Sequence, residues 1–181
     1  MRKFTLILSL AVLVLFTFST ISVAADHGYV GVFKCKMCHK KESTGDQYGI
    51  WLKSAHANAY KVLATDEAKA VAAKLKLEGN PQELDACLSC HVTAHGVDAK
   101  LLGTKYTVED GVGCESCHGP GGDYMKMTVM KDKEKAIAAG LIMPDEKTCI
   151  QCHNDKSPTF KAFDFKTAYA KIAHPIPEQK E

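Results

Sequence analysis

Beyond its first 25 residues, this 181-residue sequence lacks several features that would narrow its function at once. It has no second apolar run long enough to cross a bilayer. It has no charge excess, because removing the two basic residues at positions 2 and 3 leaves 21 Lys and Arg against 21 Asp and Glu. No basic stripe remains that would suit nucleic acid, and the only strand-like stretch lies at 104–108. These shortages argue against a nucleic-acid partner and against a β fold.

The beginning of the chain has the pattern of an export signal. Two basic residues precede a largely apolar stretch over 4–23, and Ala24 and Ala25 are the small residues that signal peptidase prefers. An uncleaved membrane anchor is the alternative, since an apolar run of this length nearly spans a bilayer. Ser and Thr residues in its second half favour cleavage. We therefore expect a signal peptide over 1–25 and one mature domain over 26–181, exported to the periplasm or the extracellular space and in contact with the membrane only through this transient segment.

What the mature chain does have is cysteine in a repeated pattern. The eight cysteines form four pairs, and in each pair two residues separate the cysteines and a histidine follows directly. The four motifs are CKMCH (35–39), CLSCH (87–91), CESCH (114–118) and CIQCH (149–153). Eight cysteines in an exported protein would ordinarily suggest disulfides. Zinc ribbons and thiol redox pairs do not need a histidine at that position, whereas c-type haem attachment does.

The chemistry of haem attachment explains this spacing. Two thiols on adjacent turns of a short helix reach the two vinyl groups of one porphyrin, and the following histidine then points its imidazole at the iron. We therefore predict four covalently attached haem c groups. The attaching cysteines would be Cys35, Cys38, Cys87, Cys90, Cys114, Cys117, Cys149 and Cys152, and the proximal iron ligands would be His39, His91, His118 and His153.

The remaining four histidines could supply a second ligand to each iron. His56 lies in YGIWLKSAHANAY, where apolar neighbours on an expected helix would bury the imidazole. His174 is followed by Pro175, which ends the last expected helix and fixes where the imidazole points. Exposed helix histidines are the alternative at both positions, but we favour a ligand role because a buried imidazole needs a partner.

The other two histidines have two open interpretations each. His95 follows the proximal His91 by four residues, so it cannot reach the far face of the same haem. It would serve a neighbouring haem or bind a propionate. His27 lies at the start of the mature chain, where it is either a ligand or part of a frayed end. The methionines of DYMKMTVM (123–130) are a further source of ligands, although helix packing is the better interpretation of them.

Four porphyrins on so short a chain leave no room for a separate large core, so we expect the haems to form it. The predicted fold class is therefore mainly α, with helices and long loops wrapped around four covalently bound haems and little or no β-sheet. Helices are expected over 48–63 and 66–77, from 80 into the second motif, from 123 to about 140, from 144 into the fourth motif, and after 158.

With these motifs in place, the chain resembles the tetrahaem cytochrome c-554 family. The resemblance is carried by CKMCH followed by WLKSAHANA, and by DACLSCHVTAHG, GVGCESCHGPGG, and CIQCHNDKSPTF with KIAHP. It implies a periplasmic electron carrier with closely stacked haem pairs, mostly bis-His, and it supports His56 and His174 as distal ligands. In that family another distal histidine follows the third motif, where this chain has DYMKM. In this chain the haem that this histidine would serve depends on His95, His27 or a methionine for its distal ligand, or its iron keeps an open position.

Three functions are compatible with these features. Bis-His iron is coordinatively saturated, which favours electron transfer between redox partner proteins without catalysis. One open iron would instead allow an enzyme that acts on nitric oxide, nitrite or hydroxylamine. His27, on a free end, could also ligate a haem of a second copy and so build a homo-oligomer or an extracellular filament. We favour the electron carrier, with haem propionates giving an acidic surface for basic docking patches on its partners.

Overall fold

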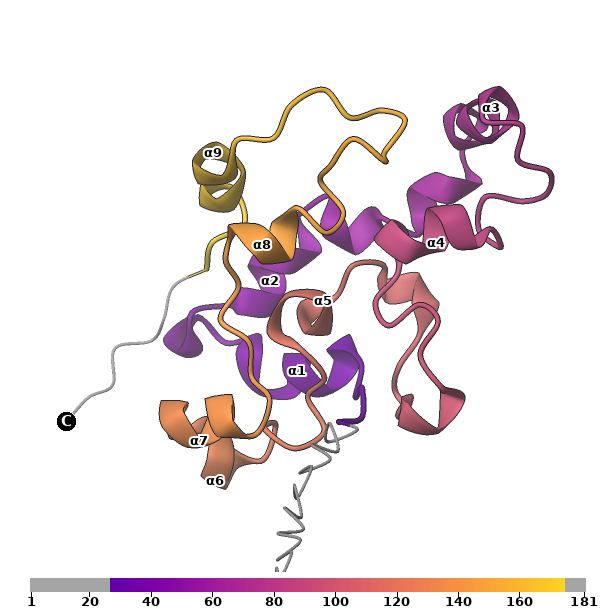
Figure 1. Ribbon diagram of the computed structural model, residues 1–181. Coiled ribbons are helices and arrows are strands. Elements are labelled where there is room, and N and C mark those ends of the chain that lie inside the picture. Colours follow the sequence, from indigo (N-terminus) through magenta and orange to yellow (C-terminus); the bar gives the residue numbers. More distant parts are fainter. Residues whose placement is uncertain (1–26, 175–181) are drawn as a thin grey trace, which may run out of the picture.

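The computed structural model describes residues 27–174 and consists of short helices joined by long loops (Figure 1). The α-helices are α1 (Val32–His39), α2 (Gln47–Leu52), α3 (Asp66–Lys74), α4 (Asp85–His91), α5 (Cys114–His118), α6 (Met127–Met130), α7 (Lys133–Ala138), α8 (Glu146–Cys149) and α9 (Phe165–Ala170). Single 3₁₀ turns lie at Glu42–Thr44, His56–Asn58, Lys61–Ala64, Ala99–Leu101 and Val108–Asp110.

The mainly α fold class is confirmed. Within the described residues the β pairing is limited to an isolated bridge between Tyr29 and Leu102. The strand expected at 104–108 is wrong, because this stretch is a turn that leads into the 3₁₀ turn Val108–Asp110. No helix within 27–174 has the length and apolar character needed to span a membrane. The predicted signal peptide lies outside the described residues.

Each of the four motifs begins on a helix. The helices α1, α4 and α5 all end at the histidine of their motif. The fourth motif differs, since α8 ends at Cys149 and the chain continues as turns in which the N–H groups of Cys152 and His153 both bond to the Cys149 carbonyl, at 3.2 and 3.0 Å. Local helical geometry of this kind holds the two thiols and the imidazole of each motif on one short segment, as haem attachment requires.

The helix expected over 48–63 is broken, which is a correction to the prediction. α2 ends at Leu52, and His56 starts a separate 3₁₀ turn. The carbonyl of His56 accepts the N–H of Val112 at 3.1 Å, and the indole of Trp51 donates to the Val112 carbonyl at 2.9 Å. These two bonds hold the interrupted stretch against the distant residue Val112. Tertiary contacts therefore override the local helix preference.

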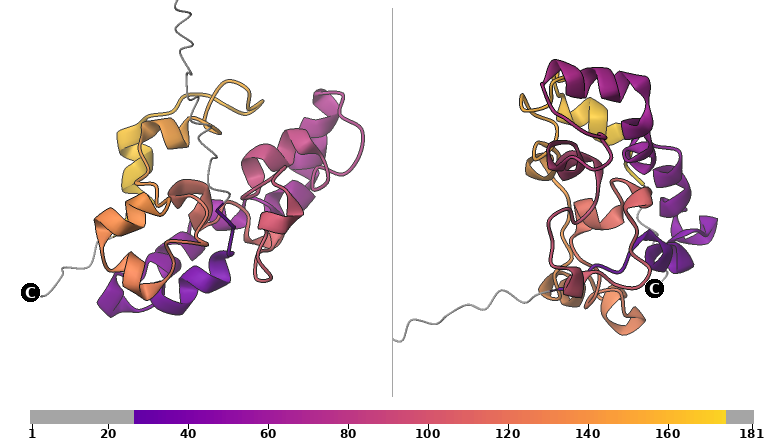
Figure 2. Two further views of the ribbon diagram at one scale, coloured as in Figure 1. Left: turned by 60° about the horizontal axis from the view of Figure 1, so that its bottom comes forward. Right: turned by 90° about the vertical axis from the view of Figure 1, so that its right-hand side faces the viewer.

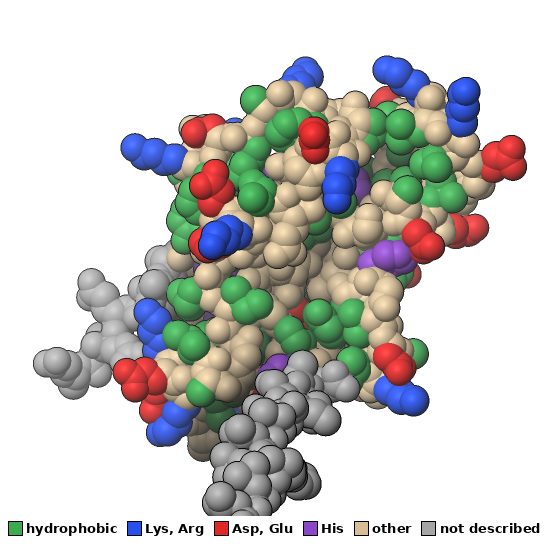
Figure 3. Space-filling view, viewed as in Figure 1, with side chains coloured by type: hydrophobic (Ala, Val, Ile, Leu, Met, Phe, Trp, Pro, Cys, Tyr) green, Lys and Arg blue, Asp and Glu red, His purple; other side chains and the backbone are tan. Residues whose placement is uncertain are grey.

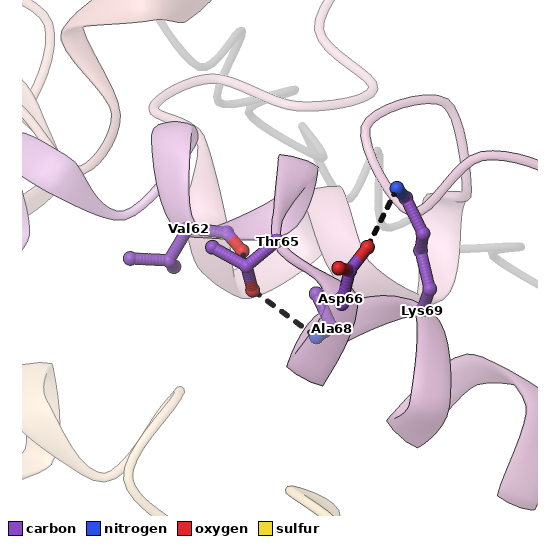
Figure 4. A network of polar contacts seen from close by, with 5 residues as sticks. All are labelled: Val62, Thr65, Asp66, Ala68 and Lys69. Carbon is purple, nitrogen blue, oxygen red and sulfur yellow. Dashed lines mark hydrogen bonds and ion pairs between the residues drawn. The ribbon is translucent and has the colours of Figure 1, made fainter.

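The helix α3 has clear signals at both ends, and Figure 4 shows the first of them. The Thr65 hydroxyl caps the helix by accepting the N–H of Ala68 at 3.2 Å, and Lys69 binds Asp66 at 3.0 Å. α3 then stops before the expected end at 77. Lys76, with φ of 58°, takes the left-handed conformation that commonly ends a helix.

Two other helices also differ from expectation. Asn80 caps only a turn, by accepting the N–H of Gln82 at 3.1 Å, and α4 begins later, at Asp85. The expected helix from Asp123 to about 140 is instead the pair α6 and α7. Asp132 caps α7 by accepting the N–H of Lys135 at 3.1 Å, whereas the carboxylate of Asp123 is bound to His27.

The helices are arranged around the motif segments rather than around a large protein core. α5 packs against α1 in the middle of the molecule, while α3 lies at one end and the α6–α7 pair lies at the other in both further views (Figure 2). The buried hydrophobic residues within 27–174 are Val32, Ala57, Ala59, Leu63, Ala72, Val92, Tyr124 and Ala136, of which half are alanines. Met37 and Ile150, inside the first and fourth motifs, are 58% and 44% exposed. This distribution suits a chain that packs its apolar side chains on porphyrins.

The surface carries both signs of charge without a dominant patch on the face shown in Figure 3. Lysine side chains there are interspersed with aspartate and glutamate, and apolar side chains lie between them. This mixture agrees with the balanced charge of the mature sequence.

Candidate haem sites

The first and third motifs meet through their leading cysteines. α1 and α5 are packed together, and the Cys114 thiol lies close enough to Cys35 to change its pKa. Hydrogen bonding with Cys114, followed by burial, raises the pKa of Cys35 above its ordinary value. The attachment points of two haem sites that are far apart in the sequence are therefore neighbours in space.

The second and fourth motifs meet in the same way through their second cysteines. Burial and the neighbouring Cys90 raise the pKa of Cys152 to about 12. Burial and then Cys149 raise the pKa of Cys117, so the third motif also adjoins the fourth. The four motifs therefore form a row in the order first, third, fourth and second. All eight cysteines lie within the described residues, and none of them forms a disulfide there.

Two of the four predicted proximal histidines face a predicted distal histidine. The ring centroids of His56 and His153 are 6.0 Å apart with the planes at 66°, and those of His118 and His174 are 5.9 Å apart at 64°. Two imidazole nitrogens that each lie about 2 Å from one metal ion place their ring centres roughly 6 Å apart. The spacing of both pairs therefore fits an iron atom held between two histidines.

Several of these histidines are oriented through Nδ1. His91 Nδ1 lies 2.6 Å from the Ala59 carbonyl and His118 Nδ1 lies 3.0 Å from the Ile142 carbonyl. His39 Nδ1 lies 3.2 Å from the Gln47 side-chain oxygen. A metal-binding histidine normally donates one ring N–H in this way, which directs the other nitrogen, here Nε2, toward the metal. These three proximal histidines thus have the orientation that iron ligation needs.

The protonation of the paired histidines also suits ligation. Burial, followed by the neighbouring His153, lowers the pKa of His56. Burial is likewise the main cause that lowers the pKa of His118, and His174 and His39 add to it. Neutral imidazole is the form that binds a metal ion, so both shifts favour the ligand form at neutral pH.

His27 and His95 differ in the nitrogen that each engages. His27 Nδ1 lies 2.5 Å from a carboxylate oxygen of Asp123, which is the carboxylate–histidine arrangement of a metal ligand. His95 instead uses Nε2, which lies 3.0 Å from a carboxylate oxygen of Asp85. Neither has a ring contact with another histidine among the described residues. The structure therefore brings together His56 with His153 and His118 with His174, but it brings neither His27 nor His95 against a proximal histidine ring.

Sequence reasoning missed the residues that position these histidines. Phe163 stacks on the imidazole of His153, with centroids 4.8 Å apart and planes at 15°. Asp123 holds His27, and Gln47 contacts His39. No local pattern marks any of them, because each acts on a histidine that the fold, and not the motif, brings to it.

Comparison with known proteins adds independent support. A family model described as "Cytochrome c554 and c-prime" matches residues 34–119, which contain the first three motifs. Cytochrome c-554 of Nitrosomonas europaea is 34% identical over 152 residues, which cover 73% of this chain. The chain spans 60% of the length of that relative. No solved structure matches the chain. Taken together with the haem-attachment motifs, these matches show that the chain belongs to the cytochrome c-554 family, whose members are c-type cytochromes with covalently bound haem.

Proposed function

We propose that this protein is an exported carrier of electrons that holds four haem c groups and exchanges electrons with redox partner proteins. In this proposal residues 1–25 are a cleaved signal peptide and residues 26–181 form one domain that works in the periplasm or outside the cell. The observation that carries the proposal is the spacing of the two histidine pairs, 6.0 and 5.9 Å between ring centroids. Haem iron with two histidine ligands supplies one-electron exchange and has no open position for a substrate.

The chain's own residues divide into attaching and ligating groups. The eight cysteines would form the thioethers, and His39, His91, His118 and His153 would be the proximal ligands. His56 would complete the site of the fourth motif, and His174 would complete that of the third. His27 is the better candidate for a further distal ligand, because Asp123 holds its Nδ1, whereas Asp85 occupies the Nε2 nitrogen of His95.

The row of motifs supports docking sites at its two ends. Cysteine contacts place the third and fourth motifs in the middle of the row and the first and second motifs at its ends. Donor and acceptor proteins would therefore dock near α1 and near α4, at the two ends of the row.

The test is the haem content and spin state of the exported protein. Mass spectrometry after denaturation should show four additional haem masses, roughly 2.5 kDa in total, because thioether attachment survives unfolding. Low-temperature electron paramagnetic resonance (EPR) of the oxidised protein should show low-spin iron, and carbon monoxide should not change the visible spectrum of the reduced protein. A chain of bare mass would contradict the proposal.

A second candidate is a haem enzyme with one open iron that acts on nitric oxide, nitrite or hydroxylamine. Its support is the 3.0 Å contact between Asp85 and Nε2 of His95, which engages the ligand nitrogen of the histidine nearest the second motif. A high-spin EPR signal together with carbon monoxide binding would favour this function over the carrier.

A further inference from the structure

Glu115 is a buried acidic residue inside the third motif, between Cys114 and Ser116. It is 4% exposed. One carboxylate oxygen accepts the N–H groups of Val30 at 2.9 Å and Gly121 at 2.6 Å, and the other accepts the N–H of Gly31 at 2.8 Å. The side chain therefore ties the segment before α1 to the loop after α5.

This set of partners matches an ionised carboxylate. All three partners are N–H donors, and an ionised carboxylate only accepts hydrogen bonds, whereas the protonated acid must also donate one. None of the ion pairs within the described residues includes Glu115. A buried charge is normally paired with an opposite charge. A buried carboxylate that is held only by main-chain N–H groups therefore requires an explanation.

The field of this carboxylate reaches the first and third haem sites. Burial, followed by the Glu115 charge, raises the pKa of Tyr29. The same two causes are the largest of those that raise the pKa of Tyr106. The charge also adds to the causes that raise the pKa of Cys35, after the hydrogen bond with Cys114 and burial. Cys35 and Cys114 are the leading cysteines of two different motifs, so one carboxylate lies close to both attachment points.

We propose that Glu115 is a fixed negative charge between the first and third haem sites that lowers the reduction potential of the haems bound there. The proposal rests on the proposed function, because it requires haem at both motifs. A nearby negative charge stabilises the oxidised, more positive iron, and net charge and burial are among the factors that set haem potentials. The main-chain N–H groups of Val30, Gly31 and Gly121 keep the charge in place without cancelling it by a cation.

Coulomb's law sets the size of the effect. A unit charge about 10 Å from an iron, at an effective dielectric constant of about 20, favours the oxidised form by roughly tenfold. For a one-electron couple, a tenfold change corresponds to about 59 mV. Removing the charge should therefore raise one or two of the four potentials by this amount.

Spectroelectrochemical titration of purified holoprotein tests the proposal with three variants. Glu115→Gln keeps the size of the side chain and removes the charge, and Glu115→Asp keeps the charge and loosens the hydrogen bonds. Glu67→Gln removes an exposed charge from the first turn of α3. We expect E115Q to shift the first or third haem roughly tenfold toward the reduced form at a fixed potential, while E115D and E67Q stay near wild type. An E115Q protein that is less stable but has wild-type potentials would overturn the proposal and leave Glu115 a purely structural role.

Two further measurements keep the outcome decisive. Mass spectrometry of the wild type is done first, because a chain without four haems contradicts the proposed function, whereas a four-haem protein whose potentials do not respond to E115Q contradicts only the role of Glu115. If E115Q does not mature, wild type and E115D are labelled with ¹³C-glutamate and compared by electrochemical difference infrared spectroscopy. A labelled carboxylate band that shifts on haem reduction in the wild type and is missing from E115D supports the proposal, and the absence of such a band from the wild type overturns it.

Discussion

The imidazole rings of His118 and His174 lie 5.9 Å apart and are inclined by 64°, although one ends α5 and the other follows α9 near the end of the described chain. His56 and His153 have nearly the same relationship, at 6.0 Å and 66°. In each pair one histidine belongs to a motif and the other comes from a distant segment of the chain. Both pairs have the spacing of two ligands on one iron, so their disruption should be visible at the iron itself.

Replacing His174 should open one haem. In His174→Ala the third haem loses its distal ligand, so we expect one low-spin EPR signal to be replaced by a high-spin signal and the protein to gain carbon monoxide binding, while the haem mass is unchanged. Tyr169→Phe in α9 is the matched control, since Tyr169 is 42% exposed and should leave all signals as they are. If H174A keeps every low-spin centre, His174 is not an iron ligand.

Removing the ring of Phe163 should disturb the fourth haem without opening it. Phe163 stacks on His153 at 4.8 Å and fixes the plane of that imidazole. Phe163→Ala should shift or broaden one low-spin EPR signal, because the iron senses the orientation of its imidazole ligands, and should cost about 1 kcal/mol of stability. Phe160→Ala is the control, since Phe160 is 38% exposed and is not stacked on His153. Identical spectra for F163A and wild type would rule out this positioning role.

The chain made without haem should not fold. Half of the buried hydrophobic residues among those described are alanines, so the polypeptide by itself buries too little apolar surface to offset the entropy of ordering the chain. We expect protein produced in a host that lacks haem attachment to show little helical signal in far-ultraviolet circular dichroism, and the matured protein to show the helices. A cooperative thermal transition in the haem-free chain would contradict this expectation.

Asp110 should make the stability of the holoprotein depend on pH. Burial is the main cause that raises the pKa of Asp110, and a hydrogen bond from the Val32 N–H opposes it. A raised pKa means that the folded chain binds the proton more tightly than the unfolded chain. This contribution to stability is therefore complete below the ordinary pKa of an aspartate and is lost as the pH rises through the raised pKa.

Asp110→Asn tests this sign, because an asparagine oxygen can still accept the Val32 N–H but carries no charge. We expect its thermal midpoint to exceed that of wild type at neutral pH and to equal it at about pH 3, below the ordinary aspartate pKa. Glu78→Gln, at an exposed position, should leave the midpoint unchanged at both pH values. A D110N midpoint below that of wild type at neutral pH would show that the ionised carboxylate stabilises the fold.

The differences between expectation and structure have one kind of cause. In the interrupted helix over 48–63, the carbonyl of His56 binds the Val112 N–H. The helix expected from Asp123 does not start there because His27 binds that carboxylate. In both cases a partner that is remote in the sequence competes with a local helix signal, and local patterns carry no information about such partners.

The attachment chemistry, the mainly α class and the supply of histidines could all be predicted from the sequence alone, because thiols and imidazole in one motif lie within five residues and obey local geometry. The pairing of His56 with His153 and of His118 with His174, the row of four motifs and the buried position of Glu115 were decided only by the tertiary structure. The physical reason is that a second ligand must approach the far face of a porphyrin, where the residues of its own motif cannot reach. Only the folded path of the chain determines which distant side chain arrives there.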